Sequence, residues 1–590
     1  MESLSWTYGF RLLRTNRSSH HSYRNISHSK LSKSLSWLDQ LDHRATVQSK
    51  PRPLAFCCDQ FSDSRSVGSF VTHSYARDVL IPERQNTEAT PNPSPDLVSE
   101  SFGTRIFRDE YLWSAFEIAE AVGGEIARWG PSGTISTDTR TLLPGQWFFA
   151  ISGANSDGHD FVNEALGSEM GCVGVIGNRL CRNWENGFIK VDGDPNLALE
   201  KMAKFARNRF SGVVVCLTGS VGKTTTRTMI TLALSSLGRI YQTCGNLNSM
   251  VGVALTLIGI PLDAKAAVVE VGMSRKGEIL TKARICRPSV RVILNVGHCH
   301  LEYLRSLENV AEAKGEILVE AKPGDICVMN GDDPLVMGLY VPPGVRKVLF
   351  GRGIGCDVRL VSAENIDGGR AVRVILENHM STSINHLKAA DNEIPEMAEF
   401  RIHGPGLHLA MNACAAAAVA LSLGVPLPQI SESLSRFRPV PMRSQMLVTR
   451  SGITVMNDVY NASPLSMAAA IQSLKSMDCA GKRVCILGDM LELGPTEFTA
   501  HEAVLELCRD SSIGLIMLAG KRFLAAAKKL ELVDAVCALD AEAVASKASE
   551  FLALGDVVLV KGSGGMEMGK VVSAINEIGG NRVSGWDDFM

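Results

Sequence analysis

Residues 218–225 read Thr-Gly-Ser-Val-Gly-Lys-Thr-Thr, and this stretch decides the fold of the chain. The apolar run 213–217 precedes it, and the apolar spacing of residues 229–234 predicts a helix after it. A strand, a glycine turn and a helix N-terminus together cradle phosphate, because backbone N–H groups and the helix dipole face the anion. The lysine adds a point charge, and the hydroxyl of Thr224 is placed to ligate Mg²⁺. The predicted phosphate contacts are Thr218, Gly219, Ser220, Val221, Gly222, Lys223, Thr224 and Thr225.

The loop departs from the usual G-x-x-x-x-G-K-[ST] pattern at one position, because Leu217 stands where the first glycine would be. A glycine turn of this kind can arise by chance as an ordinary strand-to-helix turn. The Lys-Thr-Thr that follows a β-branched strand favours nucleotide binding.

Composition bounds the class of protein. The 590 residues suggest three or four domains, and a formal net charge of −2 gives no sign of a nucleic acid or an anionic membrane as partner. The longest apolar candidate, 413–425, is shorter than the roughly 18 residues of a membrane span and predicts a buried helix. The 15 cysteines form no C-x-x-C pair, so they are predicted to be reduced core residues of an intracellular enzyme.

The first 57 residues differ from the rest. They hold nine Lys or Arg, only three acids and many serines. This profile predicts an organelle transit peptide, with a disordered basic tail as the alternative. Residues 58–108 are polar and predict an unstructured linker, so the fold is expected to begin near Trp113.

Residues 109–198 predict a small α/β domain. Two polar clusters stand out in it, Ser-Thr-Asp-Thr-Arg at 136–140 and Asp-Gly-His-Asp-Phe at 157–161. Taken alone they favour a capped turn and a solvated loop. The alternative is a site for a sugar nucleotide in which Arg140 meets the diphosphate.

Residues 199–437 carry the phosphate loop and further polar strand ends. Glu270 ends a buried strand, where a carboxylate directed at Mg²⁺ belongs. His298 and His300 follow another strand, and either a buried turn or a place near a metal fits them. Lys314 lies in a predicted helix, where a lysine is usually a surface residue. Residues 355–403 predict an antiparallel flap or insertion.

Residues 438–590 predict a doubly wound α/β domain. Three of its strands end in polar loops, at 457–461, 488–494 and 561–563. We expect these strand ends to share one binding edge, because ligands sit at the carboxyl ends of parallel strands.

The series of clusters resembles the Mur ligases. The resemblance covers residues 110–575 and rests on the motifs at 136–140, 157–161, 218–224, 270–272, 300–302, 313–317, 457–462 and 487–494. The Thr-Asp-Thr-Arg of 137–140 separates the chain from folylpolyglutamate synthetases, and no Asp-Asn-Pro-Arg motif of the MurE type is present. Tyr-Asn-Ala-Ser-Pro at 460–464 is similar to the Tyr-Asn-Ala-Asn-Pro motif of the MurF branch.

The resemblance implies a fold, a reaction and partners. The fold is α/β, with a three-domain Mur ligase architecture, a central P-loop parallel sheet and a Rossmann-like C-terminal domain. The reaction uses ATP and Mg²⁺ to join D-alanyl-D-alanine to UDP-N-acetylmuramoyl-tripeptide through an acyl phosphate, in peptidoglycan precursor synthesis. With the leader, it implies a monomer in the plastid stroma rather than the mitochondrion, with no nucleic acid partner and no membrane span.

The resemblance also implies the catalytic set. Lys223 would hold the β- and γ-phosphates, and Thr224 and Glu270 one Mg²⁺. His300 matches a histidine near the second metal, and Lys314 matches a lysine that is carbamylated in many Mur ligases. Arg443 matches an arginine that reaches ATP when the last domain closes.

The remaining implied contacts fall into three groups. Asn412 would meet the adenine side of ATP, with His408 in the same Gly-x-His-x-x-x-Asn segment. The UDP-substrate contacts would be Thr137, Asp138, Thr139, Arg140, Asp157 and His159, and the amine cleft would include Asp458, Tyr460, Asn461 and Lys561.

Several residues depart from the family pattern: Asn457, Val459, Ser463, Ser249, Met442 and Gly564. Most lie near the amine end of the last domain and its hinge. They leave two alternatives open, a catalytically weakened nucleotide-binding scaffold and a ligase for a different amine.

Overall fold

The computed structural model describes residues 110–153, 155–380 and 395–578. The predicted leader and linker, 1–108, lie outside these residues. Within them, no helix is both long and apolar enough to cross a membrane. Trp113, near which the fold was expected to begin, is buried.

The described chain contains three sheets, and each sheet takes its strands from one of the predicted domains. The first has the order β1-β5-β4-β3-β2 and is parallel except for β1. Its strands are β1 (Glu125–Arg128), β2 (Ile135–Ser136), β3 (Trp147–Phe149), β4 (Gly174–Gly177) and β5 (Gly187–Lys190). The helices of this region are α2 (Ala115–Val122), η3 (Thr139–Thr141), η4 (Gly158–Phe161), α3 (Glu164–Ser168) and α4 (Pro195–Arg209).

The central sheet has nine strands in the order β14-β13-β12-β11-β10-β9-β6-β8-β7. It is parallel from β7 to β12, and β13 and β14 extend it antiparallel. The antiparallel flap predicted for 355–403 is therefore a continuation of the central sheet. The parallel strands are β6 (Val213–Thr218), β7 (Ile240–Gln242), β8 (Ala266–Glu270), β9 (Val290–Ile293), β10 (Ile326–Asn330), β11 (Arg346–Gly351) and β12 (Val358–Ile366), followed by β13 (Ala371–Asn378) and β14 (Glu396–His403).

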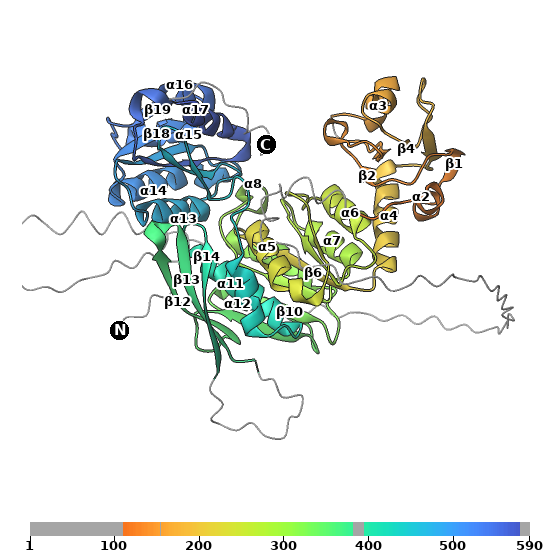
Figure 1. The fold of residues 1–590 in the computed structure, drawn as a ribbon, viewed down its shortest axis with the longest axis horizontal. Coiled ribbons are helices and arrows are strands. Elements are labelled where there is room, and N and C mark those ends of the chain that lie inside the picture. Colours follow the sequence, from red (N-terminus) through yellow and green to blue (C-terminus); the bar gives the residue numbers. More distant parts are fainter. Residues whose placement is uncertain (1–109, 154, 381–394, 579–590) are drawn as a thin grey trace, which may run out of the picture. The chain divides into compact units, whose positions relative to one another are not determined.

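Helices on both sides bury the central sheet. The helices and 3₁₀ turns of this region are α5 (Lys223–Ala233), η5 (Ser235–Leu237), α6 (Met250–Gly259), α7 (Glu278–Cys286), α8 (Leu301–Leu304), α9 (Leu307–Gly315), η6 (Glu316–Leu318), α10 (Pro334–Met337), η7 (Asp367–Gly369), α11 (His408–Ser422) and α12 (Leu427–Ser435). Strands covered on two faces read as continuous apolar runs, which explains the Val-rich β6. The buried helix predicted at 413–425 corresponds to α11, whose alanines are buried. This helix lies against α5 (Figure 1).

The last sheet has the order β15-β16-β20-β17-β18-β19, parallel apart from the edge strand β15. Its strands are β15 (Gln445–Val448), β16 (Thr454–Asp458), β17 (Arg483–Gly488), β18 (Leu515–Ala519), β19 (Val536–Ala538) and β20 (Val557–Lys561). Its helices are α13 (Pro464–Lys475), η8 (Gly494–Thr496), α14 (Glu497–Asp510), α15 (Lys521–Lys529), α16 (Ala541–Phe551), η9 (Gly564–Met566) and α17 (Gly569–Glu577). One core cluster includes α13, α14 and α15, and the other α16 and α17, so the predicted doubly wound sheet is confirmed.

Candidate active site

The phosphate loop connects β6 to α5, as predicted. Gly222 is the N-cap of α5 with φ 82°, a left-handed conformation that favours glycine. A Cβ at this position would lie 2.7 Å from the side-chain oxygen of Asn412, so the site also requires the absence of a side chain. The Lys223 ammonium donates to the carbonyl of Gly219 at 2.9 Å. Thr218 ends β6 and is buried, and Thr225 lies half-buried in the first turn of α5.

Asn295 holds the loop in shape from the neighbouring strand end. Its side-chain oxygen accepts from the N–H of Val221 at 3.0 Å, and its amide donates back to the Val221 carbonyl at 3.1 Å. The hydroxyl of Ser220 donates to the carbonyl of Gly297 and accepts from its N–H at 2.8 Å. The loop is therefore held from β9 before any ligand enters. The sequence analysis missed Asn295; its place at a strand end was the available signal.

Glu270 is buried at the end of β8 and accepts three side-chain hydrogen bonds. The Thr224 hydroxyl donates to its Oε2 at 2.8 Å and the Asn248 amide to its Oε1 at 2.8 Å. Arg227 donates to Oε2 at 3.3 Å and to the Gly245 carbonyl at 2.8 Å. The predicted pairing of Thr224 with Glu270 is present. Arg227 and Asn248 were missed, although Arg227 lies one helical turn after Thr224.

The geometry at Thr224 and Glu270 fits Mg²⁺ held together with nucleotide phosphates. Mg²⁺ is usually bound by one or two protein oxygen ligands, substrate phosphates and water, rather than by a complete protein cage. The described residues contain no group of three or more His, Cys, Asp and Glu side chains that could hold a metal by themselves. The buried carboxylate of Glu270 and the hydroxyl of Thr224 beside the phosphate loop would supply two oxygen ligands.

His300 lies at the start of α8, where its φ of 53° bends the chain. Its Nδ1 lies 2.7 Å from Oε2 of Glu492 in the C-terminal domain. Burial lowers the pKa of His300, and the positive charges of Lys314 and Lys223 lower it further, against the effect of Glu492. The predicted catalytic residues Lys223, Lys314 and His300 are therefore within electrostatic reach of one another. The lowered pKa favours the neutral imidazole, whose Nδ1 faces Glu492.

Lys314 is buried, with 3% of its surface exposed, and the expectation of a surface lysine is wrong. The reason is tertiary: α9 packs its lysine-bearing face into the core. Burial lowers the pKa of Lys314 to about 8. Within the described part of the chain, the Lys314 amine makes no hydrogen bond and no ion pair. A buried cation without a counter-charge is costly, so this position favours a neutral or modified amine.

Three strand ends of the last sheet form one edge, as predicted. The buried Lys561 ammonium donates to Oδ2 of Asp458 at 2.7 Å and to the carbonyl of Asn461 at 2.8 Å. The Ser563 hydroxyl accepts from the N–H of Leu491, which ties the third loop to the other two. Because β16, β20 and β17 are adjacent and parallel, their ends meet at the same side of the sheet.

Arg443 and Tyr460 stack. The guanidinium carbon lies 3.7 Å from the centre of the Tyr460 ring, and the Tyr460 N–H donates to the carbonyl of Met442. These contacts bring the predicted arginine of the hinge to the predicted amine cleft. The roles of both residues stay predictions. His408 lies half-buried at the start of α11, and desolvation lowers its pKa.

Met442 occupies a left-handed conformation with φ 60°. Because its side chain is 45% exposed, it contributes little packing. We expect Met442→Gly to raise the free energy of unfolding by up to about 1 kcal/mol, since glycine adopts this conformation without a Cβ clash. Chemical denaturation measures the change. Met442→Ala keeps the Cβ and is the control; an equal gain from alanine would contradict a backbone origin.

Four of the other departures take part in local contacts. Ser463 caps α13, and its hydroxyl accepts from the N–H of Ser466. Ser249 caps α6 in the same way. Asn457 donates to the side chain of Gln445 at 3.3 Å. Gly564 begins η9, where a Cβ would lie 3.2 Å from the carbonyl of Tyr460.

His501 supports the loop that carries Glu492. Its Nε2 accepts from the N–H of Met490 at 2.9 Å, and its Nδ1 donates to the Glu497 carbonyl at 2.5 Å. Both contacts require a neutral ring. Burial lowers the pKa of His501, although Asp489, 3.8 Å away, acts against this shift. Protonation would replace the acceptor at Nε2 by a second donor facing Met490.

Acid is therefore expected to destabilise the folded chain through His501. The unfolded histidine, with a pKa near 6.5, binds a proton before the folded one, so stability is lost as pH falls below 6.5. One such group contributes at most about 1.4 kcal/mol per pH unit. His501→Gln keeps an acceptor and a donor without titrating, so its unfolding midpoint should fall less between pH 7 and pH 5. Equal pH slopes for the two proteins would contradict the assignment.

The first domain gathers the predicted UDP-substrate residues into two turns. Asp138 caps η3 and pairs with Arg140 at 2.6 Å, and this pair is exposed. Thr137 and Thr139 lie half-buried on either side of Asp138. Asp157 caps η4 and accepts from His159. The capped turn expected at 136–140 is present. The second cluster, expected to be a solvated loop, is instead a capped turn around the buried His159. Substrate binding by these residues stays a prediction.

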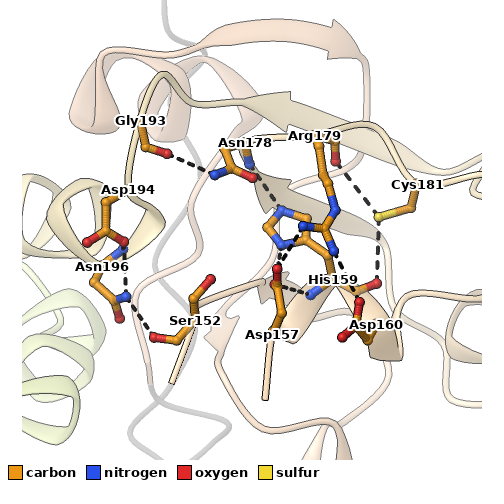
Figure 2. Close-up of polar contacts among 10 residues, drawn as sticks. All are labelled: Ser152, Asp157, His159, Asp160, Asn178, Arg179, Cys181, Gly193, Asp194 and Asn196. Atoms are coloured by element: carbon orange, nitrogen blue, oxygen red, sulfur yellow. Dashed lines mark hydrogen bonds and ion pairs between the residues drawn. The ribbon is translucent and has the colours of Figure 1, made fainter. Parts of the chain in front are cut away.

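Figure 2 shows that His159 lies at the centre of the second cluster. Its Nδ1 lies 2.6 Å from Asp157, and its Nε2 accepts from the N–H of Asn178 at 3.1 Å. Arg179 pairs with both Asp157 and Asp160. Because both of its ring nitrogens contact other residues of this domain, His159 has a structural role in this turn. The exposed arginines of the two clusters are Arg140 and Arg179.

Comparison with known proteins agrees with this arrangement. The Mur ligase middle domain family matches residues 217–420, and the Mur ligase glutamate ligase domain family matches residues 442–564. The UDP-N-acetylmuramoyl-tripeptide–D-alanyl-D-alanine ligase of Bacillus subtilis (strain 168) is 34% identical over 469 residues, which are 78% of this chain and 97% of that protein. Its Escherichia coli (strain K12) counterpart is 32% identical over 447 residues, 75% of this chain and 94% of that protein.

A solved structure is also similar. It is that of the UDP-N-acetylmuramoylalanyl-D-glutamyl-2,6-diaminopimelate–D-alanyl-D-alanyl ligase from Acinetobacter baumannii, with a TM-score of 0.66 and 27% identity, covering 80% of this chain and 99% of that one. The similarity extends along almost the whole length of these relatives. The chain belongs to the Mur ligase family and is MurF-like.

Proposed function

We propose that this chain is an ATP-dependent ligase that joins D-alanyl-D-alanine to UDP-N-acetylmuramoyl-tripeptide in peptidoglycan precursor synthesis. One observation carries the proposal: a preformed phosphate loop is hydrogen-bonded through Thr224 to the buried Glu270, with Lys223, Lys314 and His300 around it. The names of the relatives, which match this chain over more than nine-tenths of their own length, supply the substrates.

The reaction needs two steps, because a carboxylate is a poor electrophile. In the first, an oxygen of the tripeptide's terminal carboxylate attacks the γ-phosphorus of ATP and the bond to ADP breaks, giving an acyl phosphate. In the second, the amine nitrogen attacks the carbonyl carbon. The C–O bond to phosphate breaks, phosphate leaves and the nitrogen loses a proton.

The first step brings two anions together, so the site must neutralise them. Lys223 and the N–H groups of the loop would face the β- and γ-phosphates. Thr224 and Glu270 would hold Mg²⁺, which supplies positive charge that neutralises the phosphate oxygens. The clamp of Asn295 on the loop keeps these donors in place, so little reorganisation is needed during the reaction.

Lys314 fits a carbamate in this scheme. A neutral amine attacks carbon dioxide, an N–C bond forms and one proton is released. Burial and the absence of a recorded counter-charge make the neutral amine accessible near pH 8. The product is an anion that would orient a metal ion or the phosphate within electrostatic reach of Lys223 and His300.

Phosphate release tests the ligase. The purified chain should release phosphate from ATP only when UDP-N-acetylmuramoyl-tripeptide and D-alanyl-D-alanine are both present. Release with another amine in a substrate panel would support the different-amine alternative. Failure to restore growth of a bacterium depleted of this ligase, together with retained ATP binding, would support the scaffold.

The composition of residues 1–57 supports delivery to the plastid stroma, where the chain would act as a monomer. The subcellular location of a fluorescent protein fused to residues 1–57 tests this proposed localisation. Mitochondrial or cytosolic fluorescence would contradict it.

A further inference from the structure

A pocket of about 570 Å³ opens on the loops that follow Glu270 and His300. Its lining residues are Arg275, Lys276, Glu302, Tyr303, Leu304, Arg305 and Asn309. The first two follow β8, the strand that ends in Glu270, and the next four form and end α8, the helix that His300 begins. The pocket is therefore built from the two segments that follow Glu270 and His300, although no part of the proposed mechanism uses it.

One cation of the pocket is already satisfied. Lys276 donates to Glu312 at 2.5 Å and to Asn309 at 2.8 Å. The Arg275 guanidinium instead lies 5.1 Å from the centre of the Tyr303 ring, which holds it at the pocket wall without neutralising it.

Three charged side chains of the pocket lack a charged partner. Arg275, Arg305 and Glu302 are exposed, and no ion pair or side-chain hydrogen bond joins any of them to another described residue. The backbone of Arg305 has φ 73° and ψ −36°, a sparsely populated conformation for a residue with a side chain. Such strain persists where the surroundings impose it and is concentrated at binding sites.

The charges define the class of ligand. A guanidinium fork matches a carboxylate, and a lone carboxylate matches an ammonium group. Two guanidinium groups and one carboxylate in a single pocket are complementary to a zwitterionic amino-acid head group. A ligand that carries only an ammonium group would be repelled by the positive charges of Arg275 and Arg305.

The position of the pocket indicates which part of the substrate would reach it, namely the side chain of the third residue. The reacting carboxyl group belongs to the third residue of the tripeptide, so the side chain of that residue lies closest to the phosphate loop. The alanyl and glutamyl residues separate the third residue from the muramoyl sugar, and at about 3.5 Å per residue they alone span about 7 Å. The UDP diphosphate lies further away still, beyond the sugar.

We propose that Arg275, Arg305 and Glu302 form a subsite for the amino-acid head group at the far end of a diaminopimelate side chain. This inference rests on the proposed function. The two guanidinium groups bind the distal carboxylate, and Glu302 binds the distal ammonium. A tripeptide that ends in lysine has the ammonium but not the carboxylate, so the chain discriminates against it.

Two substrates test the subsite: UDP-N-acetylmuramoyl-tripeptide with meso-diaminopimelate and with L-lysine as third residue. The full chain should show a kcat/KM about ten- to a hundredfold higher with diaminopimelate, the range expected for hydrogen bonds to a charged group. The double variant Arg275→Gln/Arg305→Gln should lose this preference while its kcat/KM with lysine stays within about twofold. Arg346→Gln, an exposed arginine at the start of β11, is the matched control and should keep the preference.

Equilibrium binding of both tripeptides without ATP separates this inference from the ligase assignment. A binding preference that the double variant abolishes supports the subsite even if no phosphate is released, an outcome that would overturn only the ligase. Equal kcat/KM values for the two substrates in the unmodified chain overturn the subsite. So does an equal loss with both substrates in the double variant, since the arginines would then hold a group common to both, such as the diphosphate or the glutamyl carboxylate. Absence of binding by either tripeptide overturns both proposals.

Discussion

Lys223→Ala is expected to lower kcat/KM for ATP by about a thousandfold while leaving the fold intact. The ammonium is the cation of the phosphate loop. Within the described residues, its only hydrogen bond is to the Gly219 carbonyl at 2.9 Å. A preorganised donor to a transition-state charge contributes a factor of about 10² to 10³. Arg227, a buried cation on the same helix, cannot replace it, because Arg227 is bound to Glu270 and to the Gly245 carbonyl.

Steady-state phosphate release measures this loss, and thermal unfolding shows whether the variant is folded. Lys347→Ala removes an exposed lysine from β11 in the same domain and should keep full activity. A Lys223→Ala protein that retained more than a tenth of the activity would show that the loop lysine does not carry the phosphate charge.

Lys314→Ala is expected to lower kcat by a similar factor, and its cause can be separated from a general loss of packing. If the carbamate forms, the unmodified chain stripped of carbon dioxide should lose activity and regain it when bicarbonate is added. Because the pKa of Lys314 is lowered to about 8, the neutral amine predominates above that pH. Reactivation should therefore be faster at pH 9 than at pH 6.5.

The alanine variant should not respond to bicarbonate at either pH. Intact mass measurement of the wild-type chain should show the mass of one added carbon dioxide, and the Lys314→Ala variant should lack this added mass. Indifference of the unmodified chain to carbon dioxide, with full activity in Lys314→Ala, would remove the lysine from the mechanism.

The chemistry of the phosphate loop could be predicted from local sequence. Residues 218–225 require a turn between a strand and a helix, and the backbone N–H groups that bind phosphate belong to the stretch itself. The same holds for Glu270, because an acid at the end of an apolar run is placed at a sheet edge by the strand that carries it. The polar loops after β16, β17 and β20 were predictable for the same reason, since parallel strands end at one edge.

Other features depended on contacts between residues far apart in the chain. The spacing around Lys314 fits a surface helix as well as a buried one, and only the packing of α9 decides which side faces water. Asn295 and Asn248 acquire their roles from the loops that meet them, and His159 has both nitrogens engaged by residues from two different turns.

The sequence by itself therefore determined that this chain binds a nucleotide at the end of a parallel strand, because backbone conformation and helix polarity are local properties. The tertiary structure decided which cations near that site are paired and which are not. Lys276 is neutralised by Glu312 from another helix, whereas Arg275 and Arg305 remain without a carboxylate partner in the described chain. Charge pairing depends on distances across the fold, which no spacing along the chain records.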